Sequence, residues 1–218
     1  MKKIYFFCFA LLLSGCTIQY DGSNRLLVSG KIIDKNGNPI SNIEVITNVS
    51  NGSGWGNSND DIGIDLTDSQ GNFMMFFPKP KRDDLQYSIQ FQGYDGIYQE
   101  KRFMNVLYED FSNLEYNLDV IKLYKQEEII NLELYFASEN YSKQIADIHL
   151  IGEISNNEVW VNLPNEDNYY YPQNFYQVVK NQVITVEYSV YNSSNNQTTY
   201  HTESIEIGEE DLSYTINY

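Results

Sequence analysis

The chain has 218 residues with 30 acidic and 14 basic side chains, so its formal net charge is −16. Such acidity disfavours nucleic acid as a partner, because that affinity rests on Lys and Arg side chains that neutralise phosphates. The only cysteines are Cys8 and Cys16, which excludes a disulfide-rich scaffold, so the stability of the chain must come from a hydrophobic core.

The N-terminus has the pattern of a signal peptide. Lys2 and Lys3 precede an apolar run of ten residues, Ile4 to Leu13, and small residues follow before Cys16. A permanent membrane-spanning helix needs roughly 20 apolar residues, so this run is too short to be one. A buried core helix is the alternative, and the position behind two lysines at the very N-terminus disfavours it.

The sequence Leu13-Ser14-Gly15-Cys16 resembles the lipobox of bacterial lipoproteins. The resemblance implies diacylglyceryl attachment to the Cys16 thiol, cleavage of residues 1–15, and acylation of the new amino group. Several acyl chains give a stable anchor, since each buried CH₂ adds about 0.8 kcal/mol. The mature chain would then carry a charge of −18 and no free thiol. In a host with two membranes, Thr17 in place of Asp resembles lipoproteins sent to the outer membrane.

The rest of the chain predicts an all-β fold. Polar residues 16–25 suggest a lipidated tether, and from residue 26 apolar residues alternate with polar ones between short turns. Asn36-Gly37 with Pro39, and Asp68 with Gly71, are two such turns. The pattern breaks and restarts near 125–128, and no segment has sustained helical periodicity. We therefore expect two tandem β-sandwich domains, 26–125 and 128–218, the second immunoglobulin-like.

Three stretches of the first domain, VSGKIIDKNGNPISNIEVI, TDSQGNF and FQGY, resemble the carboxypeptidase regulatory-like domain, a transthyretin-like β-sandwich. The matched positions are Gly30, Asp34, Gly37, Pro39, Ile43, Val45, Thr67, Asp68, Gly71, Phe73, Gly93 and Tyr94. They are mostly turn and core residues, so the resemblance implies a fold and no catalytic residues. The segments 50–61 and 99–113 are longer than in that family.

Two groups of residues are candidate metal ligands. Asp60, Asp61, Asp65 and Asp68 offer the carboxylate oxygens that calcium prefers, but they lack the spacing of an EF-hand loop. Asp68 also has a structural interpretation as the first residue of a turn. His149, His201 and Glu203 could meet across strands as a zinc site. The simpler interpretation is two ordinary strand histidines, and we expect no cofactor.

Exposed aromatic residues are the candidate binding residues. Trp55 lies among glycines and polar residues, where its ring could stack on a sugar or a peptide, or fold back onto the sandwich. Tyr169, Tyr170 and Tyr171 form a run of the rigid, amphipathic side chain that suits recognition surfaces. Trp160 could be exposed on a sheet or covered.

These features predict a lipid-anchored protein of the bacterial cell envelope that is not an enzyme. Its work would be binding a protein partner or a glycan, with the membrane as a further partner through its lipid. Two alternatives stay open. One is an envelope hydrolase that uses loop carboxylates, and the other is a self-assembling adhesin or structural subunit that pairs by edge strands.

Overall fold

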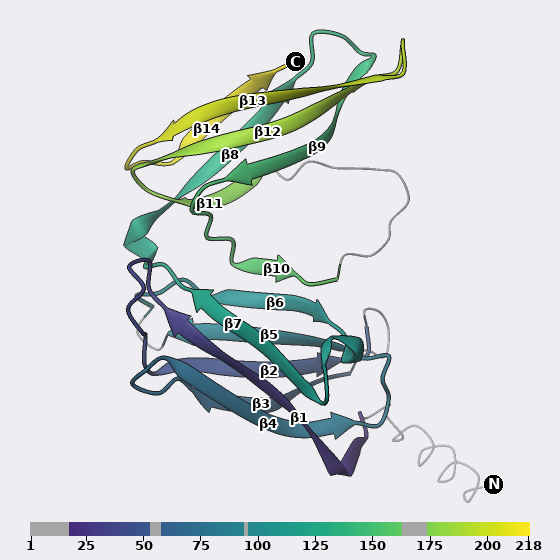
Figure 1. Cartoon of the computed structure of the whole chain (residues 1–218), viewed down its shortest axis with the longest axis vertical. Coiled ribbons are helices and arrows are strands. Elements are labelled where there is room, and N and C mark those ends of the chain that lie inside the picture. Colours follow the sequence, from purple (N-terminus) through teal and green to yellow (C-terminus); the bar gives the residue numbers. More distant parts are fainter. Residues whose placement is uncertain (1–17, 53–57, 94–95, 163–173) are drawn as a thin grey trace, which may run out of the picture. The chain divides into compact units, whose positions relative to one another are not determined.

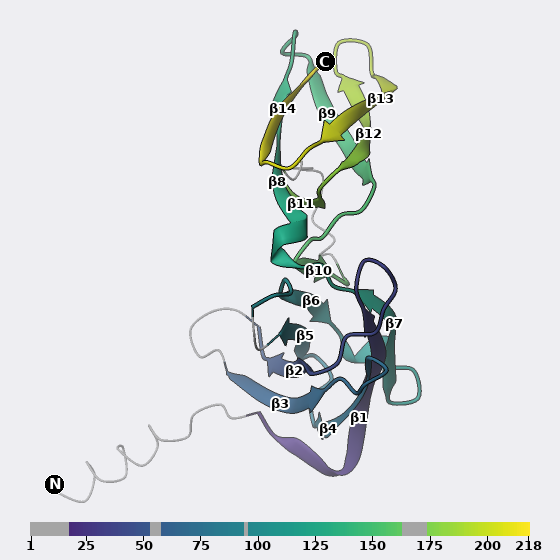
Figure 2. The same ribbon diagram turned by 90° about the vertical axis from the view of Figure 1, so that its left-hand side faces the viewer.

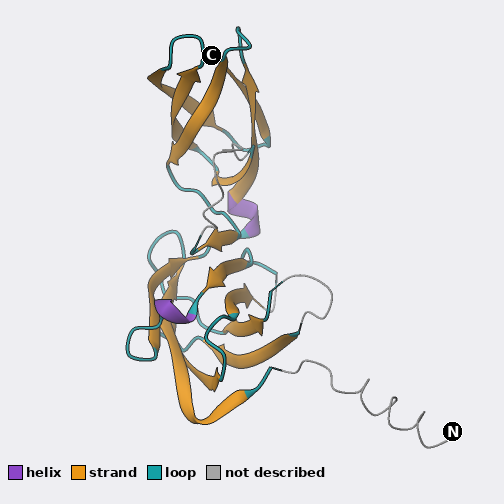
Figure 3. Cartoon of the chain, turned by 90° about the vertical axis from the view of Figure 1, so that its right-hand side faces the viewer, coloured by secondary structure: helices purple, strands orange, loops and turns teal. Residues whose placement is uncertain are grey.

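The computed structural model describes residues 18–52, 58–93, 96–162 and 174–218. The expected signal peptide, 1–15, and the lipidation site, Cys16, lie outside the described residues. The fold is all β, as predicted, with two short 3₁₀ turns, η1 (Tyr108–Asp110) and η2 (Gln126–Glu128) (Figure 3). In the described part of the chain no helix is both long and apolar enough to span a bilayer.

The described chain divides into two compact units (Figure 1). The first comprises residues up to 94, 100–122 and 158–163, and the second comprises 95–99, 123–157 and 164–218. The strands of the first unit are β1 (Tyr20–Ile33), β2 (Ile43–Ser50), β3 (Asn59–Leu66), β4 (Asn72–Pro80), β5 (Gln86–Gly93), β6 (Lys101–Val106), β7 (Glu115–Lys122) and β10 (Glu158–Trp160). Those of the second are β8 (Ile129–Ala137), β9 (Lys143–Ile151), β11 (Phe175–Val179), β12 (Gln182–Asn192), β13 (Gln197–Ile207) and β14 (Leu212–Asn217).

The first unit is a β-sandwich (Figure 2), and aromatic side chains fill much of its core. A three-stranded sheet, β4-β1-β7, faces a five-stranded sheet, β10-β6-β5-β2-β3. Phe73 and Phe77 of β4 contact Phe91 and Tyr87 of β5 across the sandwich, at centroid distances of 5.5 and 6.3 Å. The first pair is edge-to-face and the second is tilted, and aromatic pairs in such arrangements stabilise a core beyond the area they bury.

The second unit is a smaller sandwich with an aliphatic core. Its sheets are β11-β8-β14 and β13-β12-β9, with three strands each. Leu132 and Leu134 of β8 pack with Ile184 and Val186 of β12, and all four side chains are buried. Alternation from Ile184 to Tyr188 places these residues of β12 on one face, as the sequence predicts for this part of the strand.

Two matching turns shape the first unit. Asp34 and Asp68 each begin an Asp-x-x-Gly-Asn sequence, and the Asp Oδ1 accepts backbone N–H bonds from residues two and four positions later, all at 2.8 Å. The glycines, Gly37 and Gly71, have φ of +86° and +77°. A Cβ on Gly71 would lie 2.3 Å from the Ile32 carbonyl oxygen, whereas one on Gly37 would meet open space.

The expected tether of residues 16–25 is wrong over most of its length. Strand β1 begins at Tyr20, which pairs with Pro80, and Arg25 pairs with Pro78. The Tyr20 hydroxyl also donates to the Asp60 carboxylate at 2.5 Å, and burial with this bond raises the pKa of Tyr20. These bonds make a polar-looking segment part of the sheet.

The structure also differs from the expected boundaries, 26–125 and 128–218. Strand β10 pairs in parallel with β6 of the first unit, although it lies between β9 and β11 in sequence. In the opposite direction, residues 95–99 join the second unit, where the Gln99 amide N–H donates to the Tyr124 carbonyl. The reason is backbone pairing: each segment forms its hydrogen bonds within the unit that it joins, not within the unit expected from its place in the sequence.

Alternation fails at bulges. The pairing of β1 with β7 shifts register between Ser29 and Lys31, and Asp119 has a φ of +52°. The shift turns Val120 outward and buries Ile121, so simple alternation along β7 breaks at this point.

Candidate functional site: a polar groove on the five-stranded sheet

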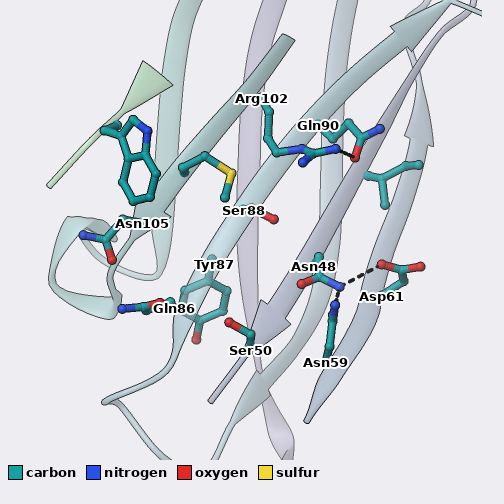
Figure 4. Close-up of a pocket in the computed structure, with 13 residues that line it drawn as sticks. Asn48, Ser50, Asn59, Asp61, Gln86, Tyr87, Ser88, Gln90, Arg102 and Asn105 are labelled. Carbon is teal, nitrogen blue, oxygen red and sulfur yellow. Dashed lines mark hydrogen bonds between the residues drawn. The ribbon is translucent and has the colours of Figure 1, made fainter. Parts of the chain in front are cut away.

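A polar groove of about 430 Å³ lies on the outer face of the five-stranded sheet of the first unit (Figure 4). Along β5, Tyr87, Ile89 and Phe91 are buried in the core, so the residues between them point to the opposite face. Every strand of the sheet contributes lining residues: Ile46, Asn48 and Ser50; Asn59 and Asp61; Gln86, Tyr87, Ser88 and Gln90; Arg102, Met104 and Asn105; and Trp160.

At one end of the groove three polar side chains of β2 and β3 form a hydrogen-bonded cluster. The Asn48 amide nitrogen donates to the Asp61 carboxylate at 3.0 Å and also to the Asn59 carbonyl oxygen (Figure 4). The register of β2 with β3 shifts between Thr47 and Asn48. Bulges redirect side chains, and this one brings Asp61 opposite Asn48.

In the middle of the groove a charged side chain is held in place by two partners. Arg102 donates from Nη2 to the Gln90 carbonyl oxygen at 3.0 Å and to the Glu100 carboxylate at 2.8 Å. Gln90 in turn donates to Gln92, which donates to Glu44. The chain of bonds fixes the direction of each amide, so the groove presents an ordered set of donors and acceptors.

A second bulge places Asn105 at the other side of the groove. The register of β5 with β6 shifts between Tyr87 and Ile89, and Asn105 has a φ of +55°. Its amide nitrogen donates to the Asn162 carbonyl, and the Asn162 side chain donates to the Asn105 carbonyl at 3.0 Å. The Asn105 Oδ1 is buried and has no hydrogen-bond partner among the described residues. Asn105 thus keeps one unsatisfied buried acceptor beside the groove.

Trp160 of β10 completes the groove. Its side chain is 51% exposed, and it stands opposite Met104 in the parallel pairing of β10 with β6. The exposed alternative for this residue is thus the correct one. A half-exposed indole at the rim of a polar groove is a flat platform for the apolar face of a ligand.

The charges of the groove nearly cancel. Arg102 is its one cation and Asp61 its one carboxylate, and no His, Cys or Lys is among its lining residues. Glycoside hydrolysis generally uses a pair of carboxylates flanking the scissile bond, which the lining residues do not supply. The Tyr87 hydroxyl is buried without a described partner, and this burial raises the pKa of Tyr87. Hydrogen-bonding side chains, mostly amides and hydroxyls, therefore predominate among the described lining residues.

The four aspartates of the calcium hypothesis do not come together. Asp60 accepts from Tyr20 and Asp61 from Asn48, while Asp65 accepts from the Met74 amide at 3.0 Å, which joins β3 to β4. Asp68 serves its turn, and the backbone N–H bonds from Asn72 and Gln70 hold its pKa below the usual range. Among the described residues no three His, Cys, Asp or Glu side chains are grouped to hold a metal ion.

The two histidines of the zinc hypothesis have different neighbours. His149 is exposed opposite Glu187, as alternation predicts. His201 is exposed too, and its ring stacks on that of Tyr188 at a centroid distance of 5.1 Å. Glu203 accepts from the hydroxyls of Tyr188 and Tyr214, and the resulting partial burial and hydrogen bond raise the pKa of Tyr188 to about 12. A second groove, of about 370 Å³, includes His201 and Lys143.

The binding candidates Trp55, Tyr169, Tyr170 and Tyr171 lie outside the described residues. Apart from Asp61 and Trp160, which the sequence analysis considered singly, the groove residues were not predicted, although the sequence carries one signal for them. In QYSIQFQ the positions between the core residues are all Gln or Ser, where a plain solvent-facing strand more often has charged residues. The bulges that aim Asp61 and Asn105, and the parallel pairing of β10, have no comparable sequence signal.

No protein-family model matches the chain. No curated protein matches it either. Among solved structures, the shaft pilin SpaA from Lactobacillus rhamnosus GG is 7% identical with a TM-score of 0.33, over 89% of this chain and 97% of the pilin. A streptococcal ancillary pilin is 10% identical with a TM-score of 0.30, over 90% of this chain and 62% of the pilin.

A 9R-lipoxygenase from Cyanothece is 15% identical with a TM-score of 0.32, over 54% of this chain. This chain covers only 20% of the lipoxygenase and 34% of the TIE protein of Bacillus anthracis, another similar structure. Likenesses this distant carry no argument about function.

Proposed function

We propose that this protein is a lipid-anchored binding protein of the bacterial cell envelope, and that the groove on its five-stranded sheet binds a neutral glycan. The single observation that carries the proposal is the half-exposed Trp160 at the rim of a groove lined by amides. The C–H face of a pyranose ring stacks on an indole, and its hydroxyls both donate and accept hydrogen bonds. Carboxamides match that demand, because each has two donors and an acceptor.

The shape and the charge of the groove support the same ligand class. It is lined from β10 to β3, which are separated by four inter-strand spacings, roughly 19 Å. That length suits an extended oligosaccharide. Arg102 and Asp61 balance one another, and the acidic protein repels anionic polymers over a Debye length of about 10 Å at 0.1 M salt. A neutral glycan is not repelled by the acidic protein, and it needs no excess charge in the groove to balance its own.

The expected lipid on Cys16 would hold this groove near a membrane. Only residues 17–19 separate Cys16 from β1, so the tether would reach about 10 Å when extended. Cys16→Ser is expected to accumulate as an unprocessed precursor without acyl chains, measured by mass and by metabolic labelling with a fatty acid. Membrane partitioning of that variant at the mature size would contradict the anchor and leave the glycan site untouched.

The glycan site is tested on a chain that begins at residue 17, which keeps every described residue. Its affinity for a panel of soluble neutral and acidic polysaccharides is measured by affinity electrophoresis and calorimetry. We expect at least one neutral glycan to bind, and Trp160→Ala to weaken it tenfold or more. Tyr141→Ala, at a fully exposed tyrosine of the second unit, is the matched control. Binding that survives Trp160→Ala unchanged, or that favours only acidic polymers, would overturn the proposal.

A further inference from the structure

One edge strand of the second unit is long and uninterrupted, unlike the other edge strands of the described chain. Exposed edges invite pairing with another chain, so proteins usually shorten or interrupt them. Strands β10, β11 and β14 have three, five and six residues. Strands β3, β7 and β9 have register shifts, and β4 carries Pro78 and Pro80.

Strand β13 has none of these protections. It has 11 residues, contains no proline, and pairs with β12 without a register shift from Ile207 to Gln197. Residues 197–202 are all exposed, and Tyr200 at their centre is 84% exposed. On its far side β13 has no neighbour among the described strands, so it is a long, continuous and open edge.

We propose that β13 pairs antiparallel with β13 of a second copy of this chain, around a two-fold axis at Tyr200. The pairing joins the two three-stranded sheets into one and places Tyr200 opposite Tyr200. Thr198 then lies opposite Thr202, and Gln197 opposite Glu203. Aromatic pairs and Thr–Thr pairs directly opposite one another stabilise antiparallel strand pairs.

The distribution of charge favours a second copy over an unrelated strand. The charged residues of β13 are Glu203 and Glu206, both in its C-terminal half. An antiparallel arrangement about Tyr200 separates the two Glu203 side chains to opposite ends of the interface, so like charges do not meet. A two-fold interface must be self-complementary, and the uncharged half of β13 satisfies that condition.

The residue on the axis gives a direct test in the chain that begins at residue 17, which contains no cysteine. Opposed Cα atoms in an antiparallel pair are about 4.5–5.5 Å apart, which a disulfide spans. Tyr200→Cys is expected to form a covalent dimer under mild oxidation at least tenfold faster than Tyr141→Cys, a control at a fully exposed residue outside the strands. Equal rates for the two variants would overturn the proposal.

Sedimentation of the same chain provides the second readout. We expect a concentration-dependent dimer that strengthens from 0.05 to 0.5 M salt, because salt screens the repulsion between two acidic molecules. Tyr200→Lys is expected to remain monomeric and Tyr141→Lys to dimerise normally. A chain that is monomeric at every concentration, or a dimer that Tyr200→Lys leaves intact, would overturn the interface. Neither result affects glycan binding by the first unit.

Discussion

Both units are β-sandwiches that bury a hydrophobic core between two sheets, but they expose different parts of a sheet. The first has a broad five-stranded sheet whose core side is aromatic and whose outer face carries amides. The second has three-stranded sheets over an aliphatic core, and it leaves the long strand β13 at an edge. A face offers side chains to a ligand, whereas an edge offers backbone groups to another strand. Alternation builds both cores, and strand number and bulges decide which surface is available.

The largest expected effect comes from emptying either core. Phe77→Ala in the first unit and Leu132→Ala in the second remove side chains that are almost fully buried, at 1% and 0% exposure. Phe77→Ala is expected to cost about 3–5 kcal/mol and Leu132→Ala about 2–5 kcal/mol, since lost burial and a residual cavity both contribute. Calorimetry of both variants checks this. If the units differ as described, Phe77→Ala destabilises the groove-bearing unit first, and glycan binding is lost at temperatures where Leu132→Ala retains it.

A matched pair of glycine substitutions separates close packing from backbone conformation. Gly37→Ala and Gly71→Ala occupy equivalent positions of the two Asp-x-x-Gly-Asn turns. Gly37→Ala is expected to cost about 1–2 kcal/mol, the penalty of positive φ alone. Gly71→Ala is expected to cost more, because its Cβ would also collide with the Ile32 carbonyl. Equal unfolding free energies in urea would show that the collision is relieved.

A smaller effect is expected from a single amide in the groove. Gln90→Ala removes one hydrogen-bonding group and one partner of Arg102. We expect glycan affinity to fall by about 0.5–1.5 kcal/mol, with little change in melting temperature. Gln144→Ala, at an exposed residue of β9, is the control and should bind normally. If Gln90→Ala bound the glycan with unchanged affinity, the centre of the groove would not be part of the binding site.

The smallest effect is a pH dependence at the Asp68 turn. Its folded pKa is lowered by backbone N–H bonds from Asn72 and Gln70, so its ionisation adds stability above the unfolded pKa of about 3.9. That stability is lost as the pH falls through the folded pKa. Asp68→Asn should therefore lower the melting temperature at pH 7 and make less difference as the pH approaches 3. If the difference in melting temperature did not depend on pH, the ionisation of Asp68 would not be its cause.

The sequence predicts the fold far better than the groove. Hydrophobic alternation identified the strands around Phe77, Phe91 and Ile184 because side-chain period follows directly from strand geometry. The polar residues 20–25 do not have the pattern of a strand. They are part of one because they pair with Pro78 and Pro80, which are distant in the sequence. The sequence showed that Trp160 could be exposed on a sheet. It did not show that Trp160 lies opposite Met104, because that position depends on a long-range parallel pairing. Local patterns do not encode such pairings.

Tryptophan fluorescence tests the central claim most directly. The chain has two tryptophans, so Trp55→Phe leaves Trp160 as the single reporter at the groove. Titration with a neutral glycan that binds the chain is predicted to shift the emission of Trp160 and to protect it from an aqueous quencher, with the affinity found by calorimetry. Calorimetric binding with unchanged emission and quenching would contradict the account, because the glycan would then occupy another site.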